Sequence, residues 1–317
     1  MNPADRMVSG MDDAAVLSGA QWTISYQDQE AVLVGVGGGL RRWRVGGVDL
    51  LDGYGSGELC PGAAGQVLAP WPNRLRDGRY RYTGVAHQLP LTEPERHNAL
   101  HGLVRWLPWT LVDRSGSSVT CECFLPAQPG YPWPLSLRTV YTLSGDGLSA
   151  EHRVTNLAGV PAPFGLSVHP YLQLPGVAVA DLRLRVPAGS RLLTDTRLLP
   201  IGAAKIDGTE WDFTEPRPIG ELVLDTAFGT LRTDPDGGST VTLTGPDGTG
   251  VAVWADASFH WWQVFTGDTL PTDRRRRSVA VEPMTCPPDG FRSGRDLVTL
   301  EPGEPWHARW QLSPLPH

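Results

Sequence analysis

The sequence predicts an all-β fold, a large antiparallel β-sandwich, and three observations support this. The composition is the first: 37 glycines and 29 prolines in 317 residues, with only 19% charged residues, describe many turns that join short strands. The second is a recurrent alternation of apolar and polar residues, which is typical of strands with one buried face. The third is the lack of any segment with the apolar spacing of a three-turn helix.

The chain is predicted to form one domain, residues 1–317, in which about the first 20 residues are a loose N-terminal tail. No internal repeat recurs at a fixed period, and no composition break is long enough to be a linker between domains. A content of 40% hydrophobic residues, including 12 tryptophans, suffices for a large core. All-β sandwiches often use more than about 200 residues in one domain, so the length is compatible with this organisation.

The first predicted strands cover residues 30–36 and 40–45, and a glycine-rich turn joins them. That turn resembles a nucleotide-binding loop only superficially, because no Lys-Ser/Thr pair follows it and no amphipathic helix begins there. Two hairpins follow later in the chain. Residues 135–143 and 148–154 flank the turn 144–147, and residues 241–243 and 251–254 flank the turn 245–248.

Charge and composition exclude several classes of partner. A formal net charge of −7 leaves no electrostatic footprint for nucleic acid or an anionic membrane. No apolar run reaches the roughly 20 residues that span a bilayer, and the N-terminus does not have the pattern of a signal peptide. The 4 cysteines are too few for a disulfide framework, which favours a cytoplasmic protein with reduced thiols. The basic run Arg274 to Arg277 is interpreted as a solvated loop, although a role in binding an anionic group stays open.

Two strands end in titratable side chains on a polar face. Val279 and Val281 share one face of a strand, so Glu282 takes the other face at the strand's end. By the same alternation, Val168 lies opposite His169, which leaves its strand on a polar and aromatic face just before Pro170. A sandwich with a concave polar outer face would gather such residues into a groove.

Five motifs together resemble the aldose 1-epimerase (galactose mutarotase) family. They occur in the family's order, and the resemblance extends from about Gly35 to the C-terminus, which implies a large antiparallel β-sandwich. The motifs are Trp71-Pro72-Asn73-Arg74-Leu75-Arg76-Asp77-Gly78-Arg79-Tyr80, Asn98-Ala99-Leu100-His101-Gly102, His169-Pro170-Tyr171, Leu224-Asp225-Thr226-Ala227-Phe228 and Val281-Glu282-Pro283.

The resemblance implies a cofactor-independent and metal-independent enzyme that interconverts the α and β anomers of a free aldohexose. It makes Glu282 the general base and His169 the general acid, the latter at least partly protonated near pH 7. The substrate-binding groups that we expect are Arg74, His101, Asp225, Asn73 and Trp71, and Trp71 or Trp262 is a candidate to pack on the sugar ring.

The identity of the sugar stays open at this point. Where many members have Asn-His-x-Tyr-Phe, this chain has Val168-His169-Pro170-Tyr171-Leu172, which resembles a bacterial branch that includes members proposed to act on sulfoquinovose. A hexose 6-phosphate or sulfoquinovose would need a basic cluster, for which Arg76, Arg79 or Arg274 to Arg277 are candidates. The sequence is also compatible with a non-catalytic carbohydrate-binding module or a glycosidase, and the protein is expected to be a monomer or a homodimer.

Overall fold

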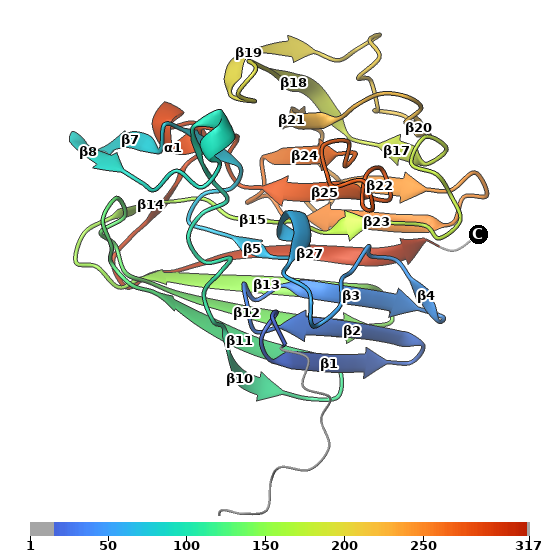
Figure 1. The fold of residues 1–317 in the computed structure, drawn as a ribbon, viewed down its shortest axis with the longest axis horizontal. Coiled ribbons are helices and arrows are strands. Elements are labelled where there is room, and N and C mark those ends of the chain that lie inside the picture. The colour runs from blue at the N-terminus through green and yellow to red at the C-terminus, as the bar shows by residue number, and fades with distance from the viewer. Residues whose placement is uncertain (1–15, 316–317) are drawn as a thin grey trace, which may run out of the picture.

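A computed structural model describes residues 16–315, which form antiparallel sheets with very little helix (Figure 1). An N-terminal sheet contains, in spatial order, β1 (Gln21–Tyr26), β2 (Gln29–Val34), β3 (Leu40–Val45) and β4 (Val48–Asp49). The turn between β2 and β3 lies at the predicted glycine-rich segment. The loose tail was predicted mainly for residues that lie outside the described part of the chain.

Two larger sheets form the body of the molecule. The nine-stranded sheet has the order β10 (Thr110–Arg114), β11 (Ser118–Leu125), β12 (Leu135–Ser144), β13 (Gly147–Asn156), β27 (Pro305–Leu315), β23 (Gly250–Ala255), β22 (Ser239–Thr244), β17 (Arg183–Arg185) and β20 (Arg217–Pro218). The eight-stranded sheet has the order β19 (Pro200–Lys205), β18 (Ala188–Thr194), β21 (Asp225–Leu231), β24 (Trp261–Phe265), β25 (Val279–Met284), β15 (Ser167–Val168) and β5 (Val67–Leu68), and β16 (Tyr171–Leu172) also pairs with β25.

The remaining elements are short. Three two-stranded sheets pair β6 (Arg74–Arg76) with β9 (Asn98–Leu100), β7 (Arg79–Tyr82) with β8 (Val85–Gln88), and β14 (Ala162–Phe164) with β26 (Val298–Leu300). The helical turns of the described residues are 3-10 turns at Pro61–Ala63 and Pro94–Arg96 and the single-turn helix α1 (Gly290–Ser293). The prediction of an all-β fold without long helices is confirmed.

The two predicted hairpins form with the expected alternation. In β12 every second side chain from Leu135 to Leu143 is buried, and β12 pairs with β13 along its whole length. The second hairpin is β22 and β23. Burying an aliphatic side chain contributes about 1.5 to 3 kcal/mol, so the apolar face of each hairpin fixes which side of the sheet turns inward.

One hydrophobic cluster occupies the space between the sheets and runs from Trp22 in β1 to Leu312 in β27. It receives Leu135 from the nine-stranded sheet and Val281 from the eight-stranded sheet, which is the arrangement of a sandwich. The N-terminal strands lie against β11 and β12, as Figure 1 shows by their position beside the green strands. The eight-stranded sheet turns one face to this cluster, and its other face, away from the core, carries the polar side chains described below.

Candidate active site

Three neighbouring strands of the eight-stranded sheet present polar side chains on the face turned away from the core. In β25, Val279 and Val281 belong to the main hydrophobic cluster, and Glu282 takes the opposite face as the alternation predicts. Gln263 in β24 lies directly across from Glu282, and Asp225 begins the next strand, β21. The Gln263 amide donates to Asp225 Oδ1 at 2.5 Å, so the sheet register itself brings the two carboxylates together.

His169 reaches the same face from the short connection between β15 and β16. Its backbone carbonyl accepts a hydrogen bond from the Gly65 N–H at 2.8 Å, and its ring stacks on Tyr171 with 4.8 Å between centroids. His169 Nε2 lies 3.4 Å from Glu282 Oε1, and both side chains are almost wholly buried. The ring of His101 approaches edge-on, with 5.4 Å between centroids.

Two loop residues in the left-handed conformation complete this wall. Asn73 has φ 53° and His101 has φ 61°, and the His101 N–H donates to the Asn73 carbonyl at 3.0 Å. The Asn73 side chain accepts from the Arg74 N–H at 2.8 Å, as Asn often does in such turns. Gly102 has φ 71°, and a Cβ there would lie 2.1 Å from the Ala69 carbonyl, so the turn after His101 requires glycine.

These side chains surround a cavity of about 200 Å³. Six of the seven predicted site residues line it: Asn73, Arg74, His101, His169, Asp225 and Glu282. The structure thus brings together residues from five segments that are far apart in the sequence.

Trp71, the seventh, is not among the lining residues. It is 3% exposed and packs against Phe291 in the main hydrophobic cluster, because the side chains of consecutive residues from Trp71 to Arg74 point in different directions. Trp262 is fully buried on the core face, where its indole N–H donates to Ser239 Oγ. The aromatic rings that do line the cavity are those of Tyr171 and Phe265.

Several buried polar atoms in this cavity have no hydrogen-bond partner within the described residues. They are Glu282 Oε2, Gln263 Oε1, His101 Nδ1 and His169 Nδ1. Leaving a buried polar group unpaired costs about 1 to 3 kcal/mol, so four such atoms in one small cavity are unusual for a purely structural region. The arrangement is suited to a ligand that is rich in hydroxyl groups.

Burial shifts the pKa values of Glu282 and His169 in opposite directions. Burial raises the pKa of Glu282 well above its usual range, and Asp225 adds to this effect while Arg74 opposes it. Burial also lowers the pKa of His169 to about 3, and the positive charges of Arg105 and Arg74 act in the same direction. Burial therefore opposes the protonated form of His169 in the free protein.

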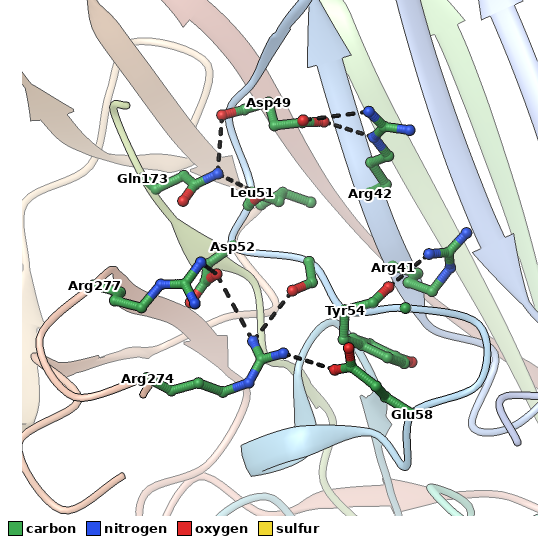
Figure 2. Close-up of a pocket in the computed structure, with 12 residues that line it drawn as sticks. Arg41, Arg42, Asp49, Leu51, Asp52, Tyr54, Glu58, Gln173, Arg274 and Arg277 are labelled. Atoms are coloured by element: carbon green, nitrogen blue, oxygen red, sulfur yellow. Dashed lines mark hydrogen bonds and ion pairs between the residues drawn. The ribbon is translucent and has the colours of Figure 1, made fainter. Parts of the chain in front are cut away.

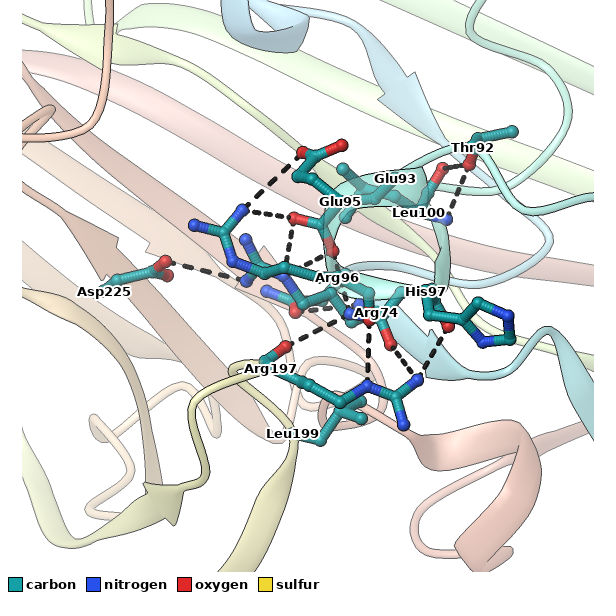
Figure 3. A network of polar contacts seen from close by, with 12 residues as sticks. Arg74, Thr92, Glu93, Glu95, Arg96, His97, Leu100, Arg197, Leu199 and Asp225 are labelled. Carbon is teal, nitrogen blue, oxygen red and sulfur yellow. Dashed lines mark hydrogen bonds and ion pairs between the residues drawn. The ribbon is translucent and has the colours of Figure 1, made fainter.

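Arg74 connects the cavity to a buried carboxylate that the motifs do not include. Its Nε lies 3.1 and 3.0 Å from the two oxygens of Glu93, and its Nη1 lies 3.6 Å from Asp225 Oδ2 (Figure 3). Glu93 and Gln263 are site residues that sequence reasoning missed. Gln263 interrupts an aromatic strand, which is a weak signal, and only the register reveals that it faces Glu282.

The predicted anion-binding arginines lie elsewhere. Arg76 pairs with Asp195 and Asp289, while Arg79 donates to Gln88 on the exposed hairpin. The interpretation of Arg274 to Arg277 as a solvated loop holds only in part. Arg275 and Arg277 are exposed, but Arg274 and Arg277 pair with buried Asp52 in a separate hollow (Figure 2). Arg105, which the sequence did not single out, lines the cavity instead.

Within residues 16–315, no cluster of His, Cys, Asp and Glu side chains has the arrangement of a metal site. In the same part of the chain, no helix is both long enough and apolar enough to cross a membrane. All 4 cysteines are buried and unpaired.

An antiparallel sandwich whose outer face holds a buried carboxylate and imidazole in a polar cavity is suited to general acid–base chemistry on a ligand rich in hydroxyl groups. The model of the aldose 1-epimerase family matches residues 21–313. The chain therefore belongs to the aldose 1-epimerase family, and it is an isomerase of the mutarotase type.

Similar proteins agree with this assignment. The uncharacterized protein YihR of Escherichia coli (strain K12) is 35% identical over 290 residues, which cover 91% of each chain. Among solved structures, the GalM/aldose epimerase homologue from C. elegans has a TM-score of 0.81 at 18% identity and covers 94% of this chain and 100% of its own. The galactose 1-epimerase from Lactobacillus acidophilus has a TM-score of 0.76 at 19% identity, with 93% and 95% covered. At these identities the solved structures establish the fold alone.

Proposed function

We propose that this protein opens and recloses the ring of a free aldohexose, with Glu282 as general base and His169 as general acid. The observation that carries the proposal is the 3.4 Å approach of His169 Nε2 to Glu282 Oε1 in a buried cavity with unpaired polar atoms. A carboxylate and an imidazole are the two groups that ring opening of a hemiacetal needs, one to take a proton and one to give one.

In the proposed reaction, Glu282 takes the proton of the C1 hydroxyl while the bond between C1 and the ring oxygen breaks. The electron pair of that bond goes to the ring oxygen, which takes a proton from His169. The resulting aldehyde rotates about the bond between C1 and C2. As the ring closes on the other face, Glu282 returns its proton to the C1 oxygen and His169 takes back the proton from the hydroxyl that becomes the ring oxygen. Positioned proton transfer of this kind contributes about 10² to 10⁴ in rate.

The pair has to carry one proton in the right place. In the free protein the raised pKa of Glu282 and the lowered pKa of His169 place that proton on the carboxyl group. Sugar hydroxyls that donate to Glu282 Oε2 would stabilise the carboxylate and so move the proton to His169. We infer that sugar binding itself produces the ionised base and the protonated acid.

The remaining lining residues are proposed to orient the sugar. Asp225 and Arg74 face each other at 3.6 Å across one wall, so they can bind adjacent hydroxyl groups in a paired fashion. His101 and Asn73 also line the cavity, and burial lowers the pKa of His101 well below the usual value, which favours its neutral form. Its Nδ1 can therefore form a hydrogen bond without repelling a protonated His169.

Exchange between the two anomeric proton signals in NMR tests the proposal. The panel is glucose, galactose, glucose 6-phosphate and sulfoquinovose, each measured with and without the protein. We expect faster exchange for at least one member. Sugar binding without any acceleration would instead support the non-catalytic binding module, and cleavage of an aryl glycoside would support the glycosidase.

A hexose with an anionic substituent is a second candidate, and Arg105 favours it. Arg105 lines the cavity, and within residues 16–315 no carboxylate lies within ion-pair distance of its guanidinium, which stacks on Trp106 at 5.2 Å. Burial lowers the pKa of Arg105, so a bound phosphate or sulfonate would offset the cost of a desolvated charge. Such an anion would also reduce the effect by which Arg105 lowers the pKa of His169.

The substitution Arg105→Gln separates the two candidates. If the substrate is anionic, kcat/KM for the sulfonated or phosphorylated hexose falls at least about tenfold, the magnitude of one lost charge-assisted contact. Rates for neutral hexoses stay within about threefold. Arg79→Gln on the exposed hairpin is the matched control. Equal losses on neutral and charged sugars would remove Arg105 from any role in anion recognition.

A cytoplasmic location and a monomeric or homodimeric state stay predictions from the sequence.

A further inference from the structure

Glu93 is a buried carboxylate beside the cavity whose position none of the family motifs explains. It is 4% exposed and follows no strand of the large sheets; it lies just before the 3-10 turn Pro94–Arg96. The turn closes on itself, because the Glu93 N–H donates to the Asn98 carbonyl and the Asn98 N–H donates back to the Glu93 carbonyl. The backbone of Glu93 is therefore held by two hydrogen bonds, and its carboxylate is held by side-chain contacts.

All the contacts of this carboxylate point toward the sugar site or its support. Arg74 Nε lies 3.1 and 3.0 Å from the two oxygens, Asn98 Nδ2 donates to Oε2 at 2.8 Å, and Arg96 Nη1 lies 3.0 Å from Oε1. Figure 3 shows Arg74 and Arg96 beside Glu93, and Arg74 also contacts Asp225. A guanidinium that is held at Nε loses its freedom to rotate, which fixes the direction of Nη1 on its other edge, toward Asp225.

Glu93 also affects how the charged groups of the cavity pair with one another. Burial opposes its ionisation, but the hydrogen bond and charge of Arg74 outweigh burial and keep the pKa of Glu93 below its usual value. An ionised Glu93 competes with Asp225 for Arg74. Without it, Arg74 would pair fully with Asp225, and the oxygens of Asp225 would no longer be available to sugar hydroxyls.

We propose that Glu93 is a positioning residue of the sugar site, which holds Arg74 Nε so that Arg74 and Asp225 face the sugar side by side without closing into a tight ion pair. The observed 3.6 Å between Arg74 Nη1 and Asp225 Oδ2, against 3.0 Å to Glu93, is the geometry that this role requires. The inference rests on the proposed function, since it assigns Glu93 to the binding of the sugar on which Glu282 and His169 act.

A double-mutant cycle with Arg74 tests this role. We expect Glu93→Gln to raise KM about tenfold or more while kcat falls less, because misplacement of a binding group costs chiefly affinity. In the Arg74→Lys background, where the Nε contact is already lost, the same substitution is expected to change kcat/KM by less than about threefold. Glu95→Gln, the same charge change at an exposed position two residues away, is the matched control.

Two further measurements keep the test decisive. Glu93→Asp keeps the charge and is expected to give an intermediate KM, which covers the case that Glu93→Gln does not fold. Affinity of the four proteins of the cycle for the sugar, followed by NMR titration, does not depend on turnover and so separates this inference from the proposed reaction. Losses from Glu93→Gln and Arg74→Lys that simply multiply, in affinity as in kcat/KM, would mean that Glu93 serves only the stability of the fold.

Discussion

Two polar hollows lie close together on this molecule, and they differ in how their polar groups are satisfied. The larger, of about 410 Å³, is lined by four arginines and three acidic side chains, and each of these charges has a partner within the described residues (Figure 2). The smaller, of about 200 Å³, holds Glu282 and His169 and leaves four buried polar atoms unpaired. The smaller hollow is therefore distinguished by four unpaired buried polar atoms, whereas the larger one has, among the described residues, the Tyr54 hydroxyl alone.

A backbone contact connects the segments that line the two hollows, so the larger hollow can support the smaller one. Asp52, in the paired hollow, donates its N–H to the carbonyl of Tyr171, whose ring stacks on His169. Arg274 donates to the Gly53 carbonyl and to Glu58. The paired hollow thus supports the chain behind the proposed catalytic pair, Glu282 and His169. Its charged groups satisfy one another, whereas the smaller cavity leaves polar atoms unpaired.

The largest effect on turnover is expected from a substitution in the smaller cavity, which holds the unpaired polar atoms. Glu282→Gln removes the base but keeps the shape of the side chain, so kcat should fall about 10³- to 10⁴-fold while the melting temperature changes little. Anomeric exchange by NMR and circular dichroism measure the two quantities. A loss of folding instead of turnover would make Glu282 part of the core and would remove the distinction between the hollows.

His169→Asn should have the next largest effect. The amide keeps a polar group near Glu282 Oε1 but cannot deliver a proton to the ring oxygen, so kcat should fall about 10²-fold with a smaller change in KM. The assay is the same NMR exchange at several sugar concentrations. An unchanged kcat would exclude His169 as the acid.

In the larger, paired hollow a substitution should lower stability more than turnover, which is the reverse of the expectation for the smaller cavity. Asp52→Asn leaves Arg277, 3.1 Å away, and Ser278 Oγ, 3.0 Å away, without their carboxylate, so stability should fall by about 1 to 3 kcal/mol. Turnover below the unfolding temperature should stay within about threefold. Urea unfolding and the exchange assay make the comparison, and a loss of kcat as large as that of His169→Asn would show that this hollow takes part in the reaction.

The smallest effect on turnover is expected from a buried histidine outside both hollows, which acts only on the pH dependence of stability. His152 accepts from the Trp310 indole N–H at 2.9 Å and contacts Thr139 Oγ1, and burial lowers its pKa to about 3. Its folded pKa lies below its unfolded value, so the stability from keeping it neutral is present above about pH 6.5 and is lost as the pH falls toward 3. In that range each proton taken up on unfolding changes the folding equilibrium about tenfold per pH unit.

Urea unfolding between pH 7 and pH 4 measures this effect. His152→Gln should reduce the pH dependence of the unfolding free energy by about one proton, because Gln can still accept from Trp310 but does not titrate. His307→Gln, at an exposed position, is the control. Equal pH dependence in wild type and His152→Gln would show that His152 is not held neutral.

Much of the fold follows from the sequence because alternation and turn chemistry are local. The strand 40–45, the two hairpins and the outward face of Glu282 are all confirmed for this reason. Six of the seven predicted site residues line the candidate cavity, and each lies in a short motif. Trp71 was misplaced because the direction of a side chain in a turn depends on backbone angles that composition does not reveal.

The sequence could not predict the features of the site that depend on strand register and on burial. Gln263 faces Glu282 only because β24 and β25 pair in one particular register. Arg105 and Glu93 act on the cavity through folding that brings distant loops together. The lowered pKa of His169 follows from how fully the surrounding chain buries it, and no motif predicts that.

The most direct test of the account is a crystal structure of the Glu282→Gln protein with a sugar that the wild type converts. We expect the sugar in the smaller cavity, with its C1 hydroxyl in hydrogen-bond contact with the side chain at position 282 and its ring oxygen facing His169 Nε2. A sugar bound in the hollow of Asp52 and Arg274, or bound in the cavity with C1 turned away from residue 282, would contradict it.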